Sequence, residues 1–183
     1  MFVLFGFFKK KKVQKVEPKN DRLYVWEEFC DVSSERYAIS DVKEGFLNII
    51  GKVPEFVLNE FISKGYRIRI VDSLDFVNGD MISTKVENQI LYVLDTDIVD
   101  ETYALYSGFG HYLYQGFKDT REINHLFSII GSDYFSDASN YFADMFGKYI
   151  SGYYDEYPEK KDRRETTYMM PIIEELNREK GGE

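Results

Sequence analysis

Apolar and polar positions follow one another along the chain with two different periods. In the longer stretches, apolar residues recur every three or four positions, which places them on one face of a helix. In shorter stretches they alternate with polar residues, as on a strand, and the last of these is nearly all apolar, as expected of a central strand. The first pattern predicts helices over 40–50, 54–64, 95–116, 119–130, 136–150 and 165–178, and the second predicts strands over 66–71, 81–86 and 89–94.

Residues with special backbone preferences mark the ends of several segments. Ser40 suits the N-cap of the first helix, and Pro54 suits the first turn of the second. Gly65 ends that second helix, and Asn78-Gly79-Asp80 predicts a turn before the second strand. The stretch Leu23–Phe29 fits either a strand or the start of a helix. The order of helices, a small sheet and a further run of helices predicts one α+β domain.

The stretch from Asp95 to Gly116 is the longest predicted helix. Side-chain oxygens in Asp95-Thr96-Asp97 can accept hydrogen bonds from the free N–H groups at a helix start, and Gly116 occupies a usual terminal position. Within it, Ser107-Gly108-Phe109-Gly110-His111 places a serine and a histidine on one face, four residues apart. Such pairs are common by chance, and a serine hydrolase also needs a group that orients the histidine.

The composition bounds the class of protein. The chain has 183 residues, 44% of them hydrophobic, with 15 Tyr and 15 Phe, which is enough for one folded core. The net charge of -9 opposes binding to nucleic acid. The single cysteine, Cys30, has no internal disulfide partner, and we expect it to pack as a small apolar side chain. The cysteine content therefore does not indicate in which cellular compartment the protein works. His111 and His125 are too few for a Cys/His-rich zinc module.

The first 21 residues differ from the rest of the chain. Residues 1–8 are apolar and four lysines follow at 9–12, the reverse of a secretory signal, whose charge precedes its apolar region. A helix needs about 20 apolar residues to span a bilayer. We expect an apolar tip and Lys-rich linker over 1–21, a single domain over 22–183, and a cytoplasmic location by default. The alternative is weak contact of residues 1–12 with an anionic membrane surface.

Four later segments carry a common family pattern. They are LNIIGKVPEFVLNEFISKGYRIRIVDS (47–73), ILYVLD (90–95), ALYSGFGHYLYQ (104–115) and SNYFADMFGKYI (139–150). Together, over about Ser40 to Glu175, they resemble the anthrax lethal factor domain family. That family includes the toxin's zinc-protease domain, the Pro-Pro endopeptidases and the toxins' receptor-binding domain. The resemblance implies a zincin-like metalloprotease fold, with a small mixed sheet packed on helices.

The resemblance also assigns positions on the helix around residue 107. In catalytic members this helix carries His-Glu-x-x-His, so that both imidazoles reach one zinc and the glutamate polarises its water. The first zinc ligand then corresponds to Ser107, the general base to Gly108, and the second ligand to His111. Glycine has no side chain with which to activate a water, and serine is a poor zinc ligand.

The remaining positions fall between residues 134 and 144. The third ligand corresponds to Asn140, a further acidic residue of that motif to Asp144, and a tyrosine that supports the transition state lies near Tyr134. Asparagine is a poor zinc ligand, so only His111 remains of the ligand set. We expect no metal and no cofactor, with His111 hydrogen-bonded to Ser107 or Asn140 as a polar replacement for the metal.

The pattern of lost positions is similar to that of the non-catalytic receptor-binding domain of the toxins. The resemblance therefore implies a bacterial, toxin-related pseudoenzyme that binds a protein or peptide partner and does not bind nucleic acid. The alternative is a zinc metallopeptidase that completes an unusual metal site with His125 or Asp144. By family analogy the protein would be secreted, although its sequence carries no standard signal peptide.

Two further regions are candidate contact surfaces. Tyr153, Tyr154 and Tyr157 belong to an expected loop over 152–164, where they could contact a partner or pack on the domain. In catalytic members, the strand that corresponds to 66–71 would border the peptide cleft. Its alternation of basic and apolar residues also suits any strand with one wet face.

Overall fold

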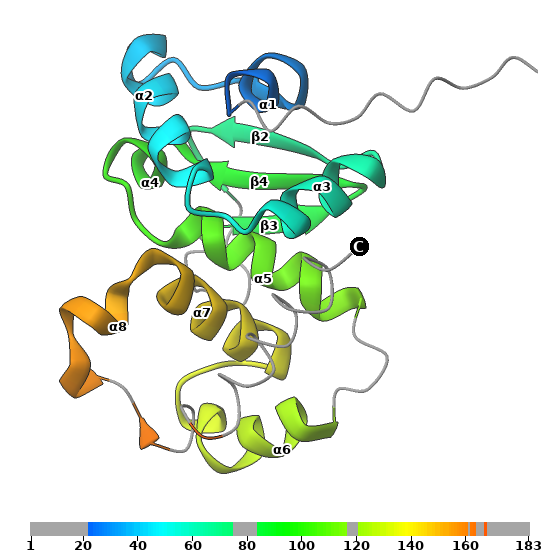
Figure 1. Cartoon of the computed structure of the whole chain (residues 1–183), viewed down its shortest axis with the longest axis vertical. Helices are drawn as coiled ribbons and strands as arrows, with labels where there is room; N and C mark the ends of the chain where they lie inside the picture. The colour runs from blue at the N-terminus through cyan, green and yellow to red at the C-terminus, as the bar shows by residue number, and fades with distance from the viewer. Residues whose placement is uncertain (1–21, 75–83, 117–120, 161, 164–166, 168–183) are drawn as a thin grey trace, which may run out of the picture.

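A four-stranded mixed sheet and the helices around it form the described part of the chain (Figure 1). This computed structural model describes residues 22–74, 84–116, 121–160, 162, 163 and 167. The strands are β1 (Cys30–Val32), β2 (Arg67–Val71), β3 (Thr84–Glu87) and β4 (Ile90–Leu94). The helices are α1 (Arg22–Phe29), α2 (Ile39–Ile50), α3 (Glu55–Ser63), α4 (Asp95–Val99), α5 (Ala104–Gly116), α6 (Arg121–Ile129), α7 (Ala138–Ser151) and α8 (Tyr153–Glu156), with 3-10 turns η1 (Gly131–Asp133) and η2 (Pro158–Lys160). The prediction of an α+β fold with a small mixed sheet is confirmed.

The strands lie in the order β1-β2-β4-β3. The first three in that order are mutually parallel, and β3 runs antiparallel to β4 at the edge. The predicted central position of β4 is therefore confirmed. Ile68 and Ile70 of β2 pair with Leu91 and Val93 of β4, and all four side chains are fully buried on one face of the sheet. β2 alternates between buried and more exposed positions, as its sequence pattern predicts.

A tight hairpin turn joins β3 to β4. Glu87 pairs with Ile90, and the two residues between them, Asn88 and Gln89, have φ angles of 52° and 61°. Left-handed backbone at both central positions is typical of the type I′ turn, whose twist matches that of paired strands. The Gln89 carbonyl accepts a hydrogen bond of 3.0 Å from the Arg67 N–H, so the turn is also tied to the start of β2.

Helix α5 lies between the sheet and α7 (Figure 1). On its sheet side, a Cβ atom at Gly108 would overlap the Leu91 side chain of β4. On its α7 side, a Cβ atom at Gly110 would lie 2.7 Å from the Cα of Ala143. The glycines of α5 therefore allow a close approach to both neighbours, because any larger side chain would push the layers apart.

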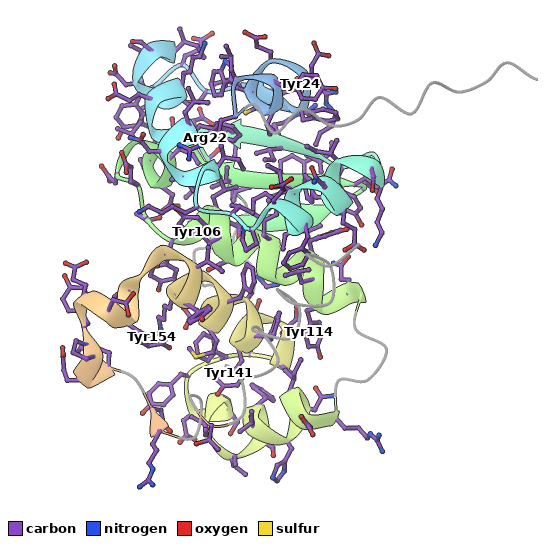
Figure 2. The ribbon with its side chains drawn as sticks, in the orientation of Figure 1. Arg22, Tyr24, Tyr106, Tyr114, Tyr141 and Tyr154 are labelled. Carbon is purple, nitrogen blue, oxygen red and sulfur yellow. The ribbon has the colours of Figure 1, made fainter. Side chains whose placement is uncertain are left out.

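Aromatic rings fill the core on either side of α5. The Phe61 ring of α3 lies 5.1 Å from Phe109 and 5.2 Å from Tyr112, with edge-on geometry in both pairs. Tyr141 of α7 is fully buried and packs its ring 5.6 Å from that of Phe135 (Figure 2). Aromatic pairs of this kind add about 0.5–1.5 kcal/mol beyond the burial of their surface. The many Tyr and Phe residues of the sequence predicted a folded core, and several of them pack in that core through these contacts.

The predicted single helix over 95–116 is wrong, because the chain breaks between α4 and α5. Glu101 has a φ of 50°, a left-handed conformation that no α-helix contains. The Thr102 hydroxyl accepts a 3.2 Å hydrogen bond from the Ala104 N–H and donates a 2.9 Å hydrogen bond to Asp97. Thr102 thus accepts from the first N–H of α5 and ties the start of that helix to α4, so Asp95 to Asp97 do not cap α5.

Asp95 instead holds the loop after β1 to the end of β4. Its side chain is fully buried and lies 3.3 Å from Arg36 Nη1. The same carboxylate accepts hydrogen bonds from the Ser34 hydroxyl and, at 2.7 Å, from the Thr96 N–H. A buried carboxylate is tolerated when charge and hydrogen bonds surround it in this way.

Other predicted boundaries differ in detail. Leu23–Phe29 is helical, and α2 begins one residue before Ser40, whose hydroxyl bonds the Asp41 carboxylate instead of a cap N–H. Pro54 precedes α3 as its N-cap, and Gly65 ends the helix with a φ of 79°. Burial raises the pKa of the Cys30 thiol to about 12, which suits its predicted role as an apolar filler.

The segment over 152–164 is partly helical, and other predicted segments lie outside the described residues. The predicted loop over 152–164 contains α8 and η2, and Tyr154 there is buried, with its hydroxyl against the Met145 sulfur. The Asn78-Gly79-Asp80 turn and the helix over 165–178 lie outside the described residues, apart from Thr167, as does the segment 1–21. In the described ranges, no helix is both long and apolar enough to cross a membrane.

Candidate functional site

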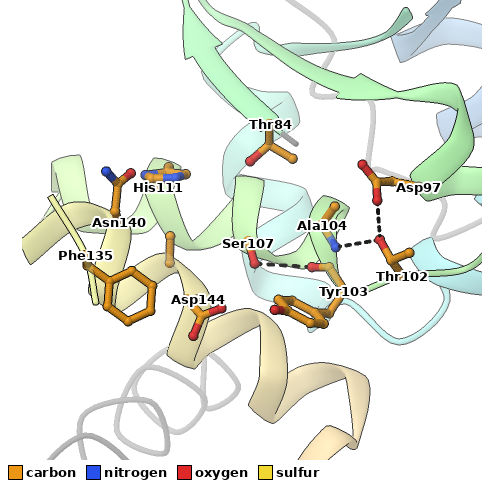
Figure 3. A pocket seen from close by; sticks show the side chains of 11 residues that line it. Thr84, Asp97, Thr102, Tyr103, Ala104, Ser107, His111, Phe135, Asn140 and Asp144 are labelled. Atoms are coloured by element: carbon orange, nitrogen blue, oxygen red, sulfur yellow. Dashed lines mark hydrogen bonds between the residues drawn. The ribbon is translucent and has the colours of Figure 1, made fainter. Parts of the chain in front are cut away.

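A cavity of about 410 Å³ lies where the edge strand β3 meets α5 and α7 (Figure 3). Its size falls in the range of ligand pockets, about 300–1,000 Å³. The residues that line it are Thr84, Asp97, Thr102, Tyr103, Ala104, Ser107, His111, Phe135, Asn140, Ala143 and Asp144. They come from β3, α4, α5 and α7 and from the segments just before α5 and α7, so the cavity depends on the tertiary arrangement of these elements.

Four of the six candidate positions meet in this cavity. Ser107 and His111 of α5 face Asn140 and Asp144 of α7 across it. On each helix the two residues are four positions apart, so each pair lies on one face. The structure therefore brings together the side chains that the resemblance assigns to one site.

The other two candidates lie elsewhere. Gly108 faces Leu91 of the sheet, so a side chain at this position would enter the core instead of the cavity. Tyr134 follows η1 with 82% of its surface exposed and does not line the cavity, whereas its neighbour Phe135 does. The aromatic ring that lines the cavity from this region is therefore Phe135, and the resemblance had assigned Tyr134.

His111 is half-buried beside the start of α7. Its Nδ1 lies 3.1 Å from the Ser139 hydroxyl, which is therefore its partner in place of the predicted Ser107 or Asn140. Burial lowers the pKa of the imidazole, while the nearby Asp137 carboxylate acts in the opposite direction. The desolvation effect is the larger, so His111 is mainly neutral at neutral pH.

Ser107 is used by its own helix. Its hydroxyl donates a 3.3 Å hydrogen bond to the Tyr103 carbonyl one turn earlier. The serine also packs against α7, because a Cβ atom at Gly147 would overlap its hydroxyl oxygen. The small size of Ser107 thus serves the contact between the two helices, and its hydroxyl is not bonded to His111.

Asn140 belongs to the capped start of α7. The Asp137 side chain accepts a 2.8 Å hydrogen bond from the Asn140 N–H, as an N-cap residue does. The Asn140 amide donates hydrogen bonds of 2.6 Å to the Ser136 hydroxyl and 3.1 Å to Asp137. The predicted start of this helix at Ser136 or Asp137 is therefore confirmed.

Asp144 forms an ion pair beneath the cavity wall. Its Oδ2 lies 2.6 Å from Lys148 Nζ, one turn further along α7. The lysine nitrogen also lies 5.9 Å from the Tyr103 ring centre and 5.8 Å from that of Tyr153, in cation–π geometry. Burial, together with the adjacent Asp144 carboxylate, raises the pKa of the Tyr103 phenol above its ordinary value. The Tyr-rich region therefore packs in part on the domain.

Asp97 is a site residue that the sequence prediction missed. It lies on α4 and reaches the cavity because the break at Glu101 turns α5 back beside α4. Burial raises the pKa of its carboxyl, the hydrogen bond from Thr102 opposes that effect, and the neighbouring Asp100 and Asp95 add to it. No periodicity in the sequence indicates this position, because it depends on the break between the two helices.

Thr84 of β3 is the second residue that the prediction missed. The strand over 66–71 was expected to border a peptide cleft, but β2 lies inside the sheet between β1 and β4. The edge position belongs to β3, whose Thr84 lines the cavity. The correction follows from the hairpin, which places β3 antiparallel at the edge next to α5.

Two observations bear on metal binding and on relatives. Over the described ranges, no three or more His, Cys, Asp and Glu side chains are grouped so that they could hold a metal ion. His125, an alternative ligand, is exposed on α6 and does not line the cavity. In comparisons with known proteins, no family model and no curated protein matches the chain.

Proposed function

We propose that the chain is a catalytically inactive, zincin-like domain that binds a protein or peptide partner at the cavity between β3, α5 and α7. The observation that carries this proposal is the meeting of Ser107, His111 and Asn140 in one cavity. These are the positions that the resemblance assigns to the zinc ligands. Their chemistry favours hydrogen bonding over zinc, since only one of the three is an effective zinc ligand.

The edge strand supports binding of an extended segment. Among the described strands, β3 is paired with β4 alone, and its Thr84 lines the cavity. Peptides often bind by adding a strand to such an edge, where main-chain hydrogen bonds supply affinity and nearby pockets select side chains. A peptide placed along β3 would have one side chain next to the cavity.

The hydrogen bonds in the site support a binding role over a catalytic one. Ser107 and Asn140 direct their polar groups into the local structure of α5 and α7. His111 is held by Ser139, and Gly108 faces the core. These four residues therefore contribute to the packing of α5 and α7, and the cavity remains between the two helices.

Metal analysis of protein purified without chelators tests the inactive part of the proposal. We expect far less than one zinc per chain, and no cleavage of a peptide library by the protein. One zinc per chain that is lost in His111→Ala would overturn the proposal in favour of a metallopeptidase with an unusual site.

Peptide selection on the full chain tests the binding part. We expect enrichment of a peptide motif that is lost in Asn140→Trp, because the larger ring would fill the cavity. Asn124→Trp is the matched control, since Asn124 is exposed on α6 and does not line the cavity. Binding that survives the first variant and is lost in the second would place the binding surface elsewhere.

A further inference from the structure

The lining of the cavity includes two carboxylates, and only one of them is paired with a lysine. Asp97 on α4 and Asp144 on α7 lie on different walls, with Thr102 and Tyr103 between them (Figure 3). Of the described residues that line the cavity, none is Lys or Arg. Lys148, which is not among the lining residues, pairs with Asp144, and its nitrogen lies 5.9 Å from the Tyr103 ring centre and 5.8 Å from that of Tyr153. No lysine or arginine of the described residues forms an ion pair with Asp97, whose hydrogen-bond partner is Thr102, so it is the less compensated of the two carboxylates.

The other polar groups are neutral and rich in oxygen. Thr84, Thr102, Tyr103 and Ser107 supply hydroxyl groups, and Asn140 supplies an amide oxygen. His111 is mainly neutral at neutral pH because burial lowers the pKa of its imidazole. Oxygen acceptors beside ionised carboxylates suit a ligand that donates several hydrogen bonds and carries positive charge.

The arrangement favours an organic cation over a metal ion. The acidic and imidazole groups are spread around the cavity, and the described residues contain no group of three or more that could hold one ion. The lining also includes the Phe135 ring and the methyl groups of Ala104 and Ala143. These apolar surfaces suit the methylene stem of a lysine or arginine side chain, whose charged end would reach the carboxylates.

We propose that the cavity receives a Lys or Arg side chain of the bound segment, with Asp97 as its main anionic partner and Asp144 as a second. This inference rests on the proposed function, because it names the residue that the bound peptide presents. The bound segment would lie along β3, and its basic side chain would pass Thr84 to enter between α4 and α7. The net charge of -9 would further favour a basic partner.

The test measures binding of the full chain to pools of capped hexapeptides that are random except at one fixed position. The fixed residue is lysine, arginine, glutamate or one of two uncharged analogues, norleucine for lysine and citrulline for arginine. We expect the lysine and arginine pools to bind about tenfold more tightly than the analogues, the effect of one charge-assisted hydrogen bond. The preference should fall in Asp97→Asn and, less strongly, in Asp144→Asn.

Folding controls and one further variant make the result specific. Asp97→Asn keeps an oxygen that can accept the Thr102 hydrogen bond, so it should fold, and thermal melts will confirm this for both variants. Glu44→Gln is the matched control, because it removes one negative charge from an exposed position on α2. The preference for basic residues should survive this substitution.

The outcomes separate the two proposals. One outcome is that pools with charged and uncharged residues bind equally well and that none binds Asn140→Trp. This outcome would overturn the choice of a basic side chain but would support the location of the binding site. A preference that persists in both Asp97→Asn and Asp144→Asn would also overturn it. Absence of binding by every pool would overturn the proposed peptide-binding function itself.

Discussion

Gly147 of α7 lies so close to Ser107 of α5 that the glycine position has no room for another carbon atom. A Cβ atom at Gly147 would overlap the Ser107 hydroxyl and lie 3.0 Å from the Ser107 backbone nitrogen. The contact helps to bring α5 and α7 together on the side where the cavity opens. Ser107 therefore takes part both in the packing of the two helices and in the lining of the cavity.

This contact predicts that Gly147→Ala destabilises the protein. Alanine favours a helix over glycine by about 1 kcal/mol, but overpacking of a tight contact costs about 1–3 kcal/mol. We expect a net loss of unfolding free energy of about 1 kcal/mol in urea denaturation. Gly116→Ala is the control, because Gly116 ends α5 with open space around its Cα, and it should be neutral or stabilising. Equal effects of the two substitutions would contradict the close packing.

Introducing a glutamate at Gly108 should not create a zinc site. The glutamate side chain would point at Leu91, which is fully buried on β4. Insertion of a large charged group into a packed core is strongly destabilising. We expect Gly108→Glu, alone or with Ser107→His, to lower the thermal midpoint and to bind no more zinc than the unmodified chain. A stable double variant that gains zinc would show that this position faces the cavity.

The buried carboxylate of Asp95 predicts a large effect on stability. Asp95→Ala would leave the Ser34 hydroxyl, the Thr96 N–H and Arg36 without their shared partner. We expect a loss of about 3 kcal/mol, at the low end for a buried ion pair because Arg36 remains partly solvated. Asp100→Ala, at an exposed position near the end of α4, should change the unfolding free energy by less than about 0.5 kcal/mol. Similar losses in the two variants would argue against the buried network.

Asp97 predicts a pH dependence of stability that runs against the usual one for a carboxylate. Burial raises its pKa above the ordinary value of 3.8, and Asp95 and Asp100 act in the same direction against the Thr102 hydrogen bond. At pH values between 3.8, the ordinary pKa, and the higher pKa of the folded chain, Asp97 is protonated more often in the folded chain than in the unfolded chain. The contribution of Asp97 to stability therefore falls as pH rises through that window.

Asp97→Asn tests this sign, because asparagine keeps an acceptor for Thr102 and does not ionise. Relative to the unmodified chain, the variant should gain unfolding free energy at neutral pH, and the gain should vanish below about pH 3.8. Urea denaturation of both proteins across this range would measure the difference. If the stability of Asp97→Asn relative to the unmodified chain instead falls as pH rises to neutral, the pKa of Asp97 is lowered in the folded chain.

The parts of the structure that depend on local signals were predictable from sequence. Asp137 and Gly152 mark the two ends of α7, one by capping the first turn and the other by a φ of 82°. The four-residue spacing on α5 correctly placed Ser107 and His111 on a common face, and both line the cavity. Helical periodicity was sufficient for these two residues because both belong to one helix.

The parts that depend on tertiary contacts were not predictable in this way. The break at Glu101 lies within a stretch whose apolar pattern suits one continuous helix, and it brings Asp97 to the cavity. Thr84 reaches the same cavity from β3, whose edge position depends on how the strands pair. The partner of His111 is Ser139 on another helix, and no spacing within α5 indicates it. These residues are joined only when the elements pack.

The turn at Asn88 and Gln89 has a consequence for how the sheet assembles. The β3–β4 pairing closes over two residues, whereas Cys30 of β1 must find Ile68 of β2 far along the chain. Local pairs form faster, because the loss of chain entropy on closing a loop grows with its length. The hairpin is thus the natural first step of sheet formation, and the edge beside the cavity would exist before the parallel strands join it. Gln89→Gly, which relieves the left-handed strain, should accelerate refolding more than it slows unfolding.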